Sequence, residues 1–226
     1  MNILCLDQFS NIGGGQRSLL DLLPAFSAQG WHPIVATPGD GPFPKMVRDL
    51  GFCTYSLPYG EYASGDKPPL EILEYAGRLP RIAWRLAKLA RALDAGLIYV
   101  NGPRLVPPAA LVSRFTKIPM VFHCHNRLFQ RSAITLTGRS LQIARANVIA
   151  CCEYVAAPVR EFLDTGSVSV IYNGVEKVRE VSWRKANARP CIGVVGRIES
   201  EKGQLEFIEA ARQVAKRVPD CRFAII

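Results

Sequence analysis

Short apolar runs alternate with longer segments of helical periodicity along most of the chain. Each apolar run is bounded by turn residues or by helix-like sequence, which is typical of buried strands. The runs predict strands at residues 3–6, 34–37, 97–100, 120–124, 148–151 and 168–171. The segments between them predict helices at residues 16–29, 44–50, 70–93, 107–115, 132–146 and 153–163. Strands that are apolar on both faces and alternate with helices indicate a doubly wound α/β fold with a parallel sheet.

The pattern changes at residues 176–189, which are polar and basic with little periodicity. This segment predicts a linker that follows an N-terminal domain of residues 1–175. A strand at 191–195, a helix at 202–217 and a strand at 222–226 then form one βαβ unit. Two strands and a helix cannot bury a core of their own. We therefore expect residues 190–226 to be the truncated start of a second α/β domain.

Composition narrows the class of protein. Of 226 residues, 49% are hydrophobic and 21% are charged, which excludes intrinsic disorder as the main state. The charge-free run 22–39 is interrupted by three prolines and cannot span a membrane as a helix. Seven cysteines without a Cys-x-x-Cys pair, and an N-terminus without a secretory leader, predict a reducing, cytoplasmic location.

The net charge points to an anionic partner. Lys and Arg number 28 against 19 Asp and Glu, which gives a formal charge of +9. Phosphate ligands, lipid headgroups and nucleic acids all fit that charge. No recognition-helix motif or aromatic RNA-binding strand accompanies the basic residues, so we expect no specific nucleic-acid partner.

Three consecutive glycines, Gly13, Gly14 and Gly15, follow the first predicted strand and open the first helix. They let the backbone approach a ligand closely and present amides at a helix N-terminus, where an anion is favoured. The dinucleotide fingerprint fails because its third glycine would fall at Ser18, and no Gly-Lys-Ser/Thr sequence occurs. A ligand-binding loop and a flexible strand–helix turn both remain open.

His123 and His125 lie two residues apart on a predicted strand, so they share one face near its carboxyl end. In open α/β sheets ligands bind at that end. A zinc site would need further His or Cys ligands at suitable spacing, and the sequence offers none nearby, so we expect no metal. The alternative places one histidine in the core and one at the surface.

The segment 193–203 carries Gly196 and Arg197 at a strand end and Lys202 at the start of the predicted helix. Arg197 could grip a diphosphate through forked hydrogen bonds, and Lys202 could act on it as a point charge. Taken alone, such a segment also fits a solvated turn.

The predicted helix 70–93 is basic and amphipathic. It has no acidic residue between Glu74 and Asp94, and Trp84 lies beside its basic face. The basic face carries Arg78, Arg81, Arg85, Lys88 and Arg91, and the apolar face carries Ile82, Leu86, Leu89 and Leu93. Such a helix can lie on an anionic bilayer, or it can pack its apolar face on the sheet and solvate its arginines.

The chain resembles the family-4 glycosyltransferases. Residues 192–226 resemble the start of their C-terminal domain, where a strand ends in Gly-Arg and Lys-Gly precedes a helix. Asn173 and Gly174 lie in a segment similar to the Ile-x-Asn-Gly-Val before the family's interdomain linker. His125–Asn126 resembles its N-domain His-Asp or His-Asn site, and Gly13–Gly15 its glycine-rich first loop. The matches fall in order and cover essentially the whole chain.

The resemblance implies the GT-B architecture, in which two Rossmann-like domains face each other and no metal is required. It implies a retaining, hexosyl-type transfer from a nucleotide-sugar donor to a hydroxyl of a glycan or lipid-linked acceptor. Arg197 and Lys202 would offset charge on the leaving diphosphate, and the amides of Gly14 and Gly15 would approach the phosphate or the sugar. His125 would be catalytic, bonding the sugar or the reacting centre. Asn173, Gly174 and Gly196 are further candidates, and membrane contact at the inner face would be peripheral.

Three departures from the family pattern matter. Its paired glutamates and its pocket for the nucleotide base would both lie beyond Ile226, so we expect no turnover from these 226 residues alone. Cys152 stands where the family often has a serine before a glutamate. A non-catalytic, glycosyltransferase-like binding module is the alternative function.

Overall fold

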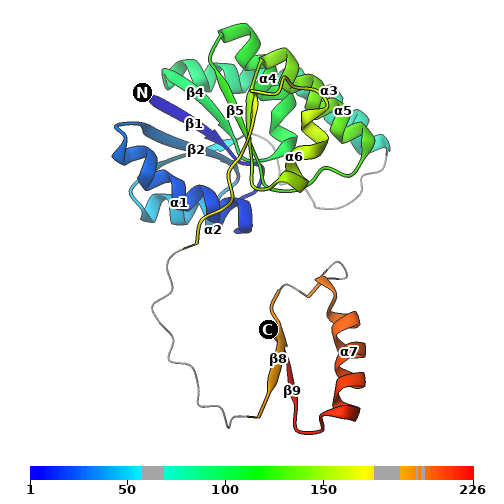
Figure 1. The fold of residues 1–226 in the computed structure, drawn as a ribbon. Helices are drawn as coiled ribbons and strands as arrows, with labels where there is room; N and C mark the ends of the chain where they lie inside the picture. The colour runs from blue at the N-terminus through cyan, green and yellow to red at the C-terminus, as the bar shows by residue number, and fades with distance from the viewer. Residues whose placement is uncertain (58–68, 176–188, 197, 200–201) are drawn as a thin grey trace. The chain divides into compact units, whose positions relative to one another are not determined.

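The computed structural model describes residues 1–57, 69–175, 189–196, 198–199 and 202–226 (Figure 1). The chain divides into two compact units, Met1–Gly174 and Val175–Ile226. Arg197 and nearly all of the predicted linker, residues 176–188, lie outside the described residues.

The first unit is built on a seven-stranded parallel sheet in the order β3-β2-β1-β4-β5-β6-β7. The strands are β1 (Asn2–Leu6), β2 (His32–Pro38), β3 (Cys53–Leu57), β4 (Ala95–Val100), β5 (Met120–Cys124), β6 (Asn147–Ala150) and β7 (Val168–Val170). The strand order runs outward from β1 in one direction and from β4 in the other. The carboxyl ends of β1 and β4 therefore flank a topological switch point, where α/β sheets bind ligands.

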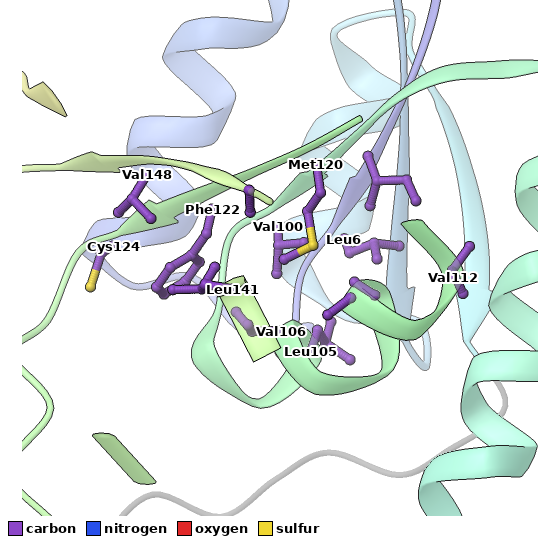
Figure 2. Close-up of a cluster of buried hydrophobic side chains, with 14 of the residues drawn as sticks. Leu6, Val100, Leu105, Val106, Val112, Met120, Phe122, Cys124, Leu141 and Val148 are labelled. Carbon is purple, nitrogen blue, oxygen red and sulfur yellow. The ribbon is translucent and has the colours of Figure 1, made fainter. Parts of the chain in front are cut away.

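Helices cover both faces of this sheet (Figure 1). They are α1 (Gly14–Ala28), α2 (Pro42–Asp49), α3 (Pro69–Ala92), α4 (Val106–Thr116), α5 (Arg131–Ala144) and α6 (Glu153–Arg160), with a 3-10 turn at Pro103–Leu105. Ile3 and Cys5 of β1 pack with α1 and α2, whereas Leu4 and Leu6 pack in the cluster that holds α3 to α6. Figure 2 shows the larger cluster, in which Phe122 is fully buried.

The predicted strands and helices of this unit are all present, with ends shifted by a few residues. Strand β3 was not predicted. It lies at the edge of the sheet, and Leu57 is its one buried residue, so its polar Cys-Thr-Tyr-Ser sequence offers no apolar run. An edge strand needs little burial because only one side of it pairs.

Helix α3 packs its apolar face on the sheet. Ile82 and Leu86 are buried, and Leu89 and Leu93 lie against the same core cluster. The packing interpretation of the apolar face is therefore confirmed, and that face is not available to a bilayer. Within the described residues, no helix has both the length and the apolar character needed to cross a membrane.

The second unit is a βαβ unit, as predicted. Strands β8 (Cys191–Val194) and β9 (Arg222–Ile225) pair in parallel, and α7 (Gln204–Arg217) connects them. Among the described residues of this unit, Gln204 is the one that is buried. Leu205 and Val195 are more than 70% exposed, so the described part of the unit does not enclose a core.

Candidate functional site

Polar side chains gather at the carboxyl edge of the sheet, on the face covered by α1. Asp7 directly follows β1, Asn101 directly follows β4, and His123 and His125 come from the end of β5. The backbone hydrogen bonds of the sheet extend to Asp7 and Asn101, because the Asp7 amide donates to the Ala36 carbonyl and the Asn101 amide to the Leu6 carbonyl. The backbone therefore fixes where these side chains begin, at the switch point of the sheet.

Asp7 is fully buried and accepts hydrogen bonds from three residues. Gln16 Nε2 of α1 lies 2.8 Å and 3.0 Å from its two oxygens, Asn101 Nδ2 lies 2.6 Å away, and the Phe9 amide lies 2.9 Å away. Burial raises the pKa of the carboxyl to about 6, although the hydrogen bonds from Asn101, Phe9 and Gln16 each act to lower it. Asp7 therefore anchors α1 to β4.

Asn101 links this carboxyl to the histidine. Its side-chain nitrogen also lies 3.1 Å from the Gly15 carbonyl oxygen, and its Oδ1 lies 2.8 Å from His125 Nε2. One amide group therefore bonds to residues of β1, α1 and the end of β5. We call the side chains of Asp7, Gln16, Asn101 and His125 the switch-point network.

The two histidine rings lie against each other at a tilt of 39°, on the common face predicted for them. Their ring centroids lie 3.9 Å apart, and His123 Nδ1 shares a hydrogen bond with the Tyr99 hydroxyl. Burial is the main reason that the pKa falls to about 3 for His123 and to about 4 for His125. Both rings are therefore neutral at neutral pH. His123 Nε2 and His125 Nδ1 are buried atoms with no hydrogen-bond partner in the described structure.

The glycine turn meets this network at the start of α1. Gly13 is the N-cap residue, and its amide donates to Gln16 Oε1 at 3.0 Å. A Cβ at Gly15 would lie 3.0 Å from His125 Cδ2, so any other residue there would require the imidazole to shift. A Cβ at Gly14 would meet nothing within 4 Å, and the first turn of α1 carries no acidic residue. Gly15 therefore packs on the histidine, while Gly14 faces open space.

The remaining predicted residues lie elsewhere in the chain. Asn173 and Gly174 are exposed after β7. In the second unit, Gly196 follows β8 and its amide donates to the Ile226 carbonyl at 2.8 Å, and Lys202 is exposed just before α7. Arg197 lies outside the described residues, so the predicted phosphate-binding roles of Arg197 and Lys202 stay predictions. His125 is placed at the switch point, and its catalytic role is likewise a prediction.

Sequence reasoning missed Asp7, Gln16, Asn101 and Tyr99. A usable signal existed for two of them, because Asp7 and Asn101 each stand directly after an apolar strand of a parallel sheet. Gln16 could have been found as the third residue after the N-cap, where Gln reaches back to the N-cap amide. In the described part of the chain, no group of three or more His, Cys, Asp or Glu side chains could hold a metal ion.

Solved structures share this fold at low sequence identity. HepE from Anabaena, crystallised with UDP, matches with a TM-score of 0.68 and 17% identity over 100% of this chain and 70% of its own. The lipopolysaccharide outer core galactosyltransferase WaaB matches with a TM-score of 0.66 and 11% identity over 100% of this chain and 68% of its own. A glycosyltransferase from Rickettsia africae matches with a TM-score of 0.64 and 18% identity over 94% of this chain and 57% of its own. These matches show a fold of the GT-B type.

No curated protein matches the sequence. A family model described as Glycosyltransferase Family 4 matches residues 12–179. That range contains most of the first unit, including the glycine turn, Asn101 and both stacked histidines. The chain therefore belongs to glycosyltransferase family 4.

Proposed function

We propose that the protein transfers a hexosyl-type sugar from a nucleotide-sugar donor to a hydroxyl of a glycan or lipid-linked acceptor. The proposed transfer retains configuration at the anomeric carbon and uses no metal or other cofactor. Family membership supports the transferase class. HepE was crystallised with UDP and with UDP-glucose, which makes UDP-glucose the first donor to test.

One observation carries the proposal: the N-terminus of α1 opens beside a neutral histidine at the switch point. Backbone amides at a helix N-terminus attract anions because the helix dipole is positive there. Gly14 has open space where a side chain would stand, and no acidic side chain competes in the first turn. A diphosphate at this turn would place the attached sugar near His125.

In the proposed reaction, charge develops on the diphosphate as it leaves the sugar. Lys202, exposed in the second unit, and Arg197 would offset that charge in the transition state. Asn173, Gly174 and Gly196 remain candidates for further donor contacts.

The glycine turn can be tested with the substitution Gly14→Asp. An aspartate in the first turn suits the helix dipole, so the fold should be as stable as the wild type or more so. The same carboxylate repels a diphosphate, so calorimetric titration with UDP-glucose should show affinity weakened at least about tenfold. Stability and binding are expected to move in opposite directions, which a merely unfolded variant cannot do.

Ser132→Asp is the matched control, because Ser132 is exposed in the first turn of α5 and the substitution adds the same charge. It should bind UDP-glucose as the wild type does. Equal binding by wild type and Gly14→Asp, or equal loss in the control, would rule out the glycine turn as the anion site. Because no turnover is expected from these 226 residues alone, the two functions are distinguished in a protein that carries a complete second domain: donor binding there without sugar transfer would favour the binding module.

We further propose that the exposed face of α3 contacts anionic lipid from the cytoplasmic side. Trp84 is 65% exposed among the exposed side chains of Arg81, Lys88 and Arg91, and Lys88 Nζ lies 5.9 Å from its ring centroid. A basic residue near an anionic surface contributes about 1 kcal/mol, and an interfacial tryptophan suits the headgroup region.

Sedimentation with phosphatidylglycerol vesicles tests this contact. Binding should weaken with added salt and should be lost when Arg81 and Lys88 are both changed to Glu. Changing Lys216 and Arg217 of α7 to Glu alters the net charge equally and should leave binding intact. Salt-independent sedimentation, or equal loss in both variants, would contradict the proposal.

A further inference from the structure

The orientation of the Asn101 amide is fixed by its neighbours. Its nitrogen lies 3.1 Å from the Gly15 carbonyl oxygen, which can only accept a hydrogen bond. It also lies 2.6 Å from Asp7 Oδ2. The atom between these two acceptors must therefore be the NH2 group, and Oδ1 must be the atom that faces His125.

This orientation decides where the proton of His125 lies. Asn101 Oδ1 is an acceptor only, and His125 Nε2 lies 2.8 Å from it, so Nε2 must carry the hydrogen. The other tautomer would set two lone pairs against each other and would leave a buried N–H at Nδ1 without a partner. An imidazolium would leave the same buried N–H unpaired, and burial already disfavours its charge.

We propose that Asn101 is a positioning residue that holds His125 as the neutral Nε2–H tautomer, so that Nδ1 is the nitrogen with the lone pair. Asp7 and the Gly15 carbonyl hold the amide in place, and Gln16 holds Asp7. Because the amide lies between them, the carboxylate does not bond to the imidazole directly, unlike a carboxylate–histidine pair. His125 is then an acceptor for a hydroxyl and not a cation for a phosphate.

This inference deepens the proposed function and rests on it only for the ligand. Nδ1 is sealed from solvent in this conformation, so a sugar hydroxyl reaches it only after neighbouring groups move. The tautomer itself belongs to the protein without any ligand, and it can be measured whether or not a donor binds.

The experiment is a long-range 15N–1H correlation spectrum of the histidine-labelled 226-residue chain at neutral pH. The sequence has three histidines, and the exposed His32 is assigned with His32→Gln. We expect His125 to carry its proton on Nε2 in a single tautomer. Asn101→Leu keeps the side-chain shape and removes all three side-chain hydrogen bonds of Asn101, so His125 should become a mixture of tautomers. Asn147→Leu, at the exposed start of β6, should leave the spectrum of His125 unchanged.

A reciprocal exchange keeps the test informative if Asn101→Leu fails to fold. In the double variant Asp7→Asn with Asn101→Asp, the amide introduced at position 7 can still accept from the Phe9 amide and Gln16 and can donate to the carboxylate introduced at position 101. The exchange gives up the hydrogen bond from position 101 to the Gly15 carbonyl oxygen, so some loss of stability is expected. That carboxylate accepts from His125 Nε2, so the Nε2–H tautomer should persist. The negative charge now lies beside the imidazole, so the pKa of His125 should rise by about 1–3 units relative to the wild type.

The proposal would be overturned by a proton on Nδ1 in the wild type, or by an unchanged single tautomer in folded Asn101→Leu. An exchanged variant whose His125 pKa does not rise would also contradict it. Failure of the proposed function gives a different result, because UDP-glucose would then not bind while the tautomer pattern stayed as expected.

Discussion

The two faces of the sheet carry different side chains at the carboxyl ends of β1, β4 and β5. Toward α3 to α6, the last residues of these strands remain apolar, at Leu6, Val100 and Cys124, and the packing continues into the buried start of α4. Toward α1, the same strands lead through Cys5, Tyr99 and His123 into Asp7, Asn101 and His125.

The difference follows from what covers each strand end. Helix α4 begins with a buried apolar turn that seals the first face. On the other face, α1 begins with glycines that bring backbone and not side chains to the strand ends. Buried polar groups can persist there because they bond to one another. The comparison teaches that one face of the sheet contributes mainly apolar packing, whereas the other carries the polar residues of the candidate site at its carboxyl edge.

Removing bulk from the apolar face should have the largest effect. Phe122 is fully buried in the larger cluster (Figure 2), and Phe122→Ala should cost about 3–5 kcal/mol of the free energy of unfolding. Urea unfolding followed by circular dichroism measures this loss. Phe129 is 75% exposed, and Phe129→Ala should stay within about 0.5 kcal/mol of the wild type. A similar loss of unfolding free energy in Phe122→Ala and Phe129→Ala would contradict the prediction.

The stability of the protein should depend on pH through the titrating groups on the face toward α1, which are Asp7, His123 and His125. The raised pKa of Asp7, about 6 against 3.8, makes the native state keep a proton that the unfolded chain releases, so its contribution falls as pH rises from about 4 to 6. The lowered pKa values of His123 and His125, about 3 and 4 against 6.5, make the unfolded chain bind more protons, so their contribution rises with pH up to about 6.5.

Asp7→Asn removes the contribution of Asp7 to stability, which falls as the pH rises, and leaves the contributions of the two histidines. Between pH 4 and 6 the free energy of unfolding should therefore rise more steeply than in the wild type, by about 2 kcal/mol over the interval. Urea midpoints at several pH values measure the two slopes. Asp21→Asn, at an exposed position of α1, should keep the wild-type slope. Parallel curves for wild type and Asp7→Asn would show that Asp7 is not the titrating group.

The two glycines at the turn should respond oppositely to the same methyl group. Gly15→Ala puts a Cβ 3.0 Å from His125 Cδ2, which should cost about 1–3 kcal/mol by overpacking. Gly14→Ala meets nothing within 4 Å, and alanine favours a helix over glycine by up to about 1 kcal/mol, so it should be neutral or stabilising. Thermal unfolding of the pair measures the difference, and equal effects would contradict the close packing of His125 on the turn.

The smallest effect is expected at the start of α6. Cys152 is the N-cap residue there and makes no side-chain capping bond. A serine hydroxyl can accept from a backbone amide of the first turn, so Cys152→Ser should stabilise the protein by about 0.5 kcal/mol, or roughly 1–2 °C in Tm. Cys151→Ser, one residue outside the cap, is the control and should bring no such gain. A lower Tm for Cys152→Ser would mean that packing of the thiol outweighs the cap.

The sequence was sufficient for most of the fold, because buried parallel strands are continuous apolar runs that can be recognised locally. Strand β3 was missed because an edge strand with one buried residue carries no such run. The glycine turn and the histidine pair were found because their spacing is local. The Asp7–Asn101 contact was not found, since it joins residues 94 positions apart and neither residue is unusual by itself.

That separation also constrains when the site can assemble. Residue 7 leaves the ribosome long before residue 101, so the N-terminal strand must wait for β4 before its buried carboxyl gains the Asn101 amide. Closing so long a loop is a late and costly event in folding. A nascent chain halted before β4 would therefore leave one edge of β1 unpaired, with the Asp7 carboxyl beside it lacking the Asn101 amide, and unpaired strand edges are one reason that nascent chains need chaperones.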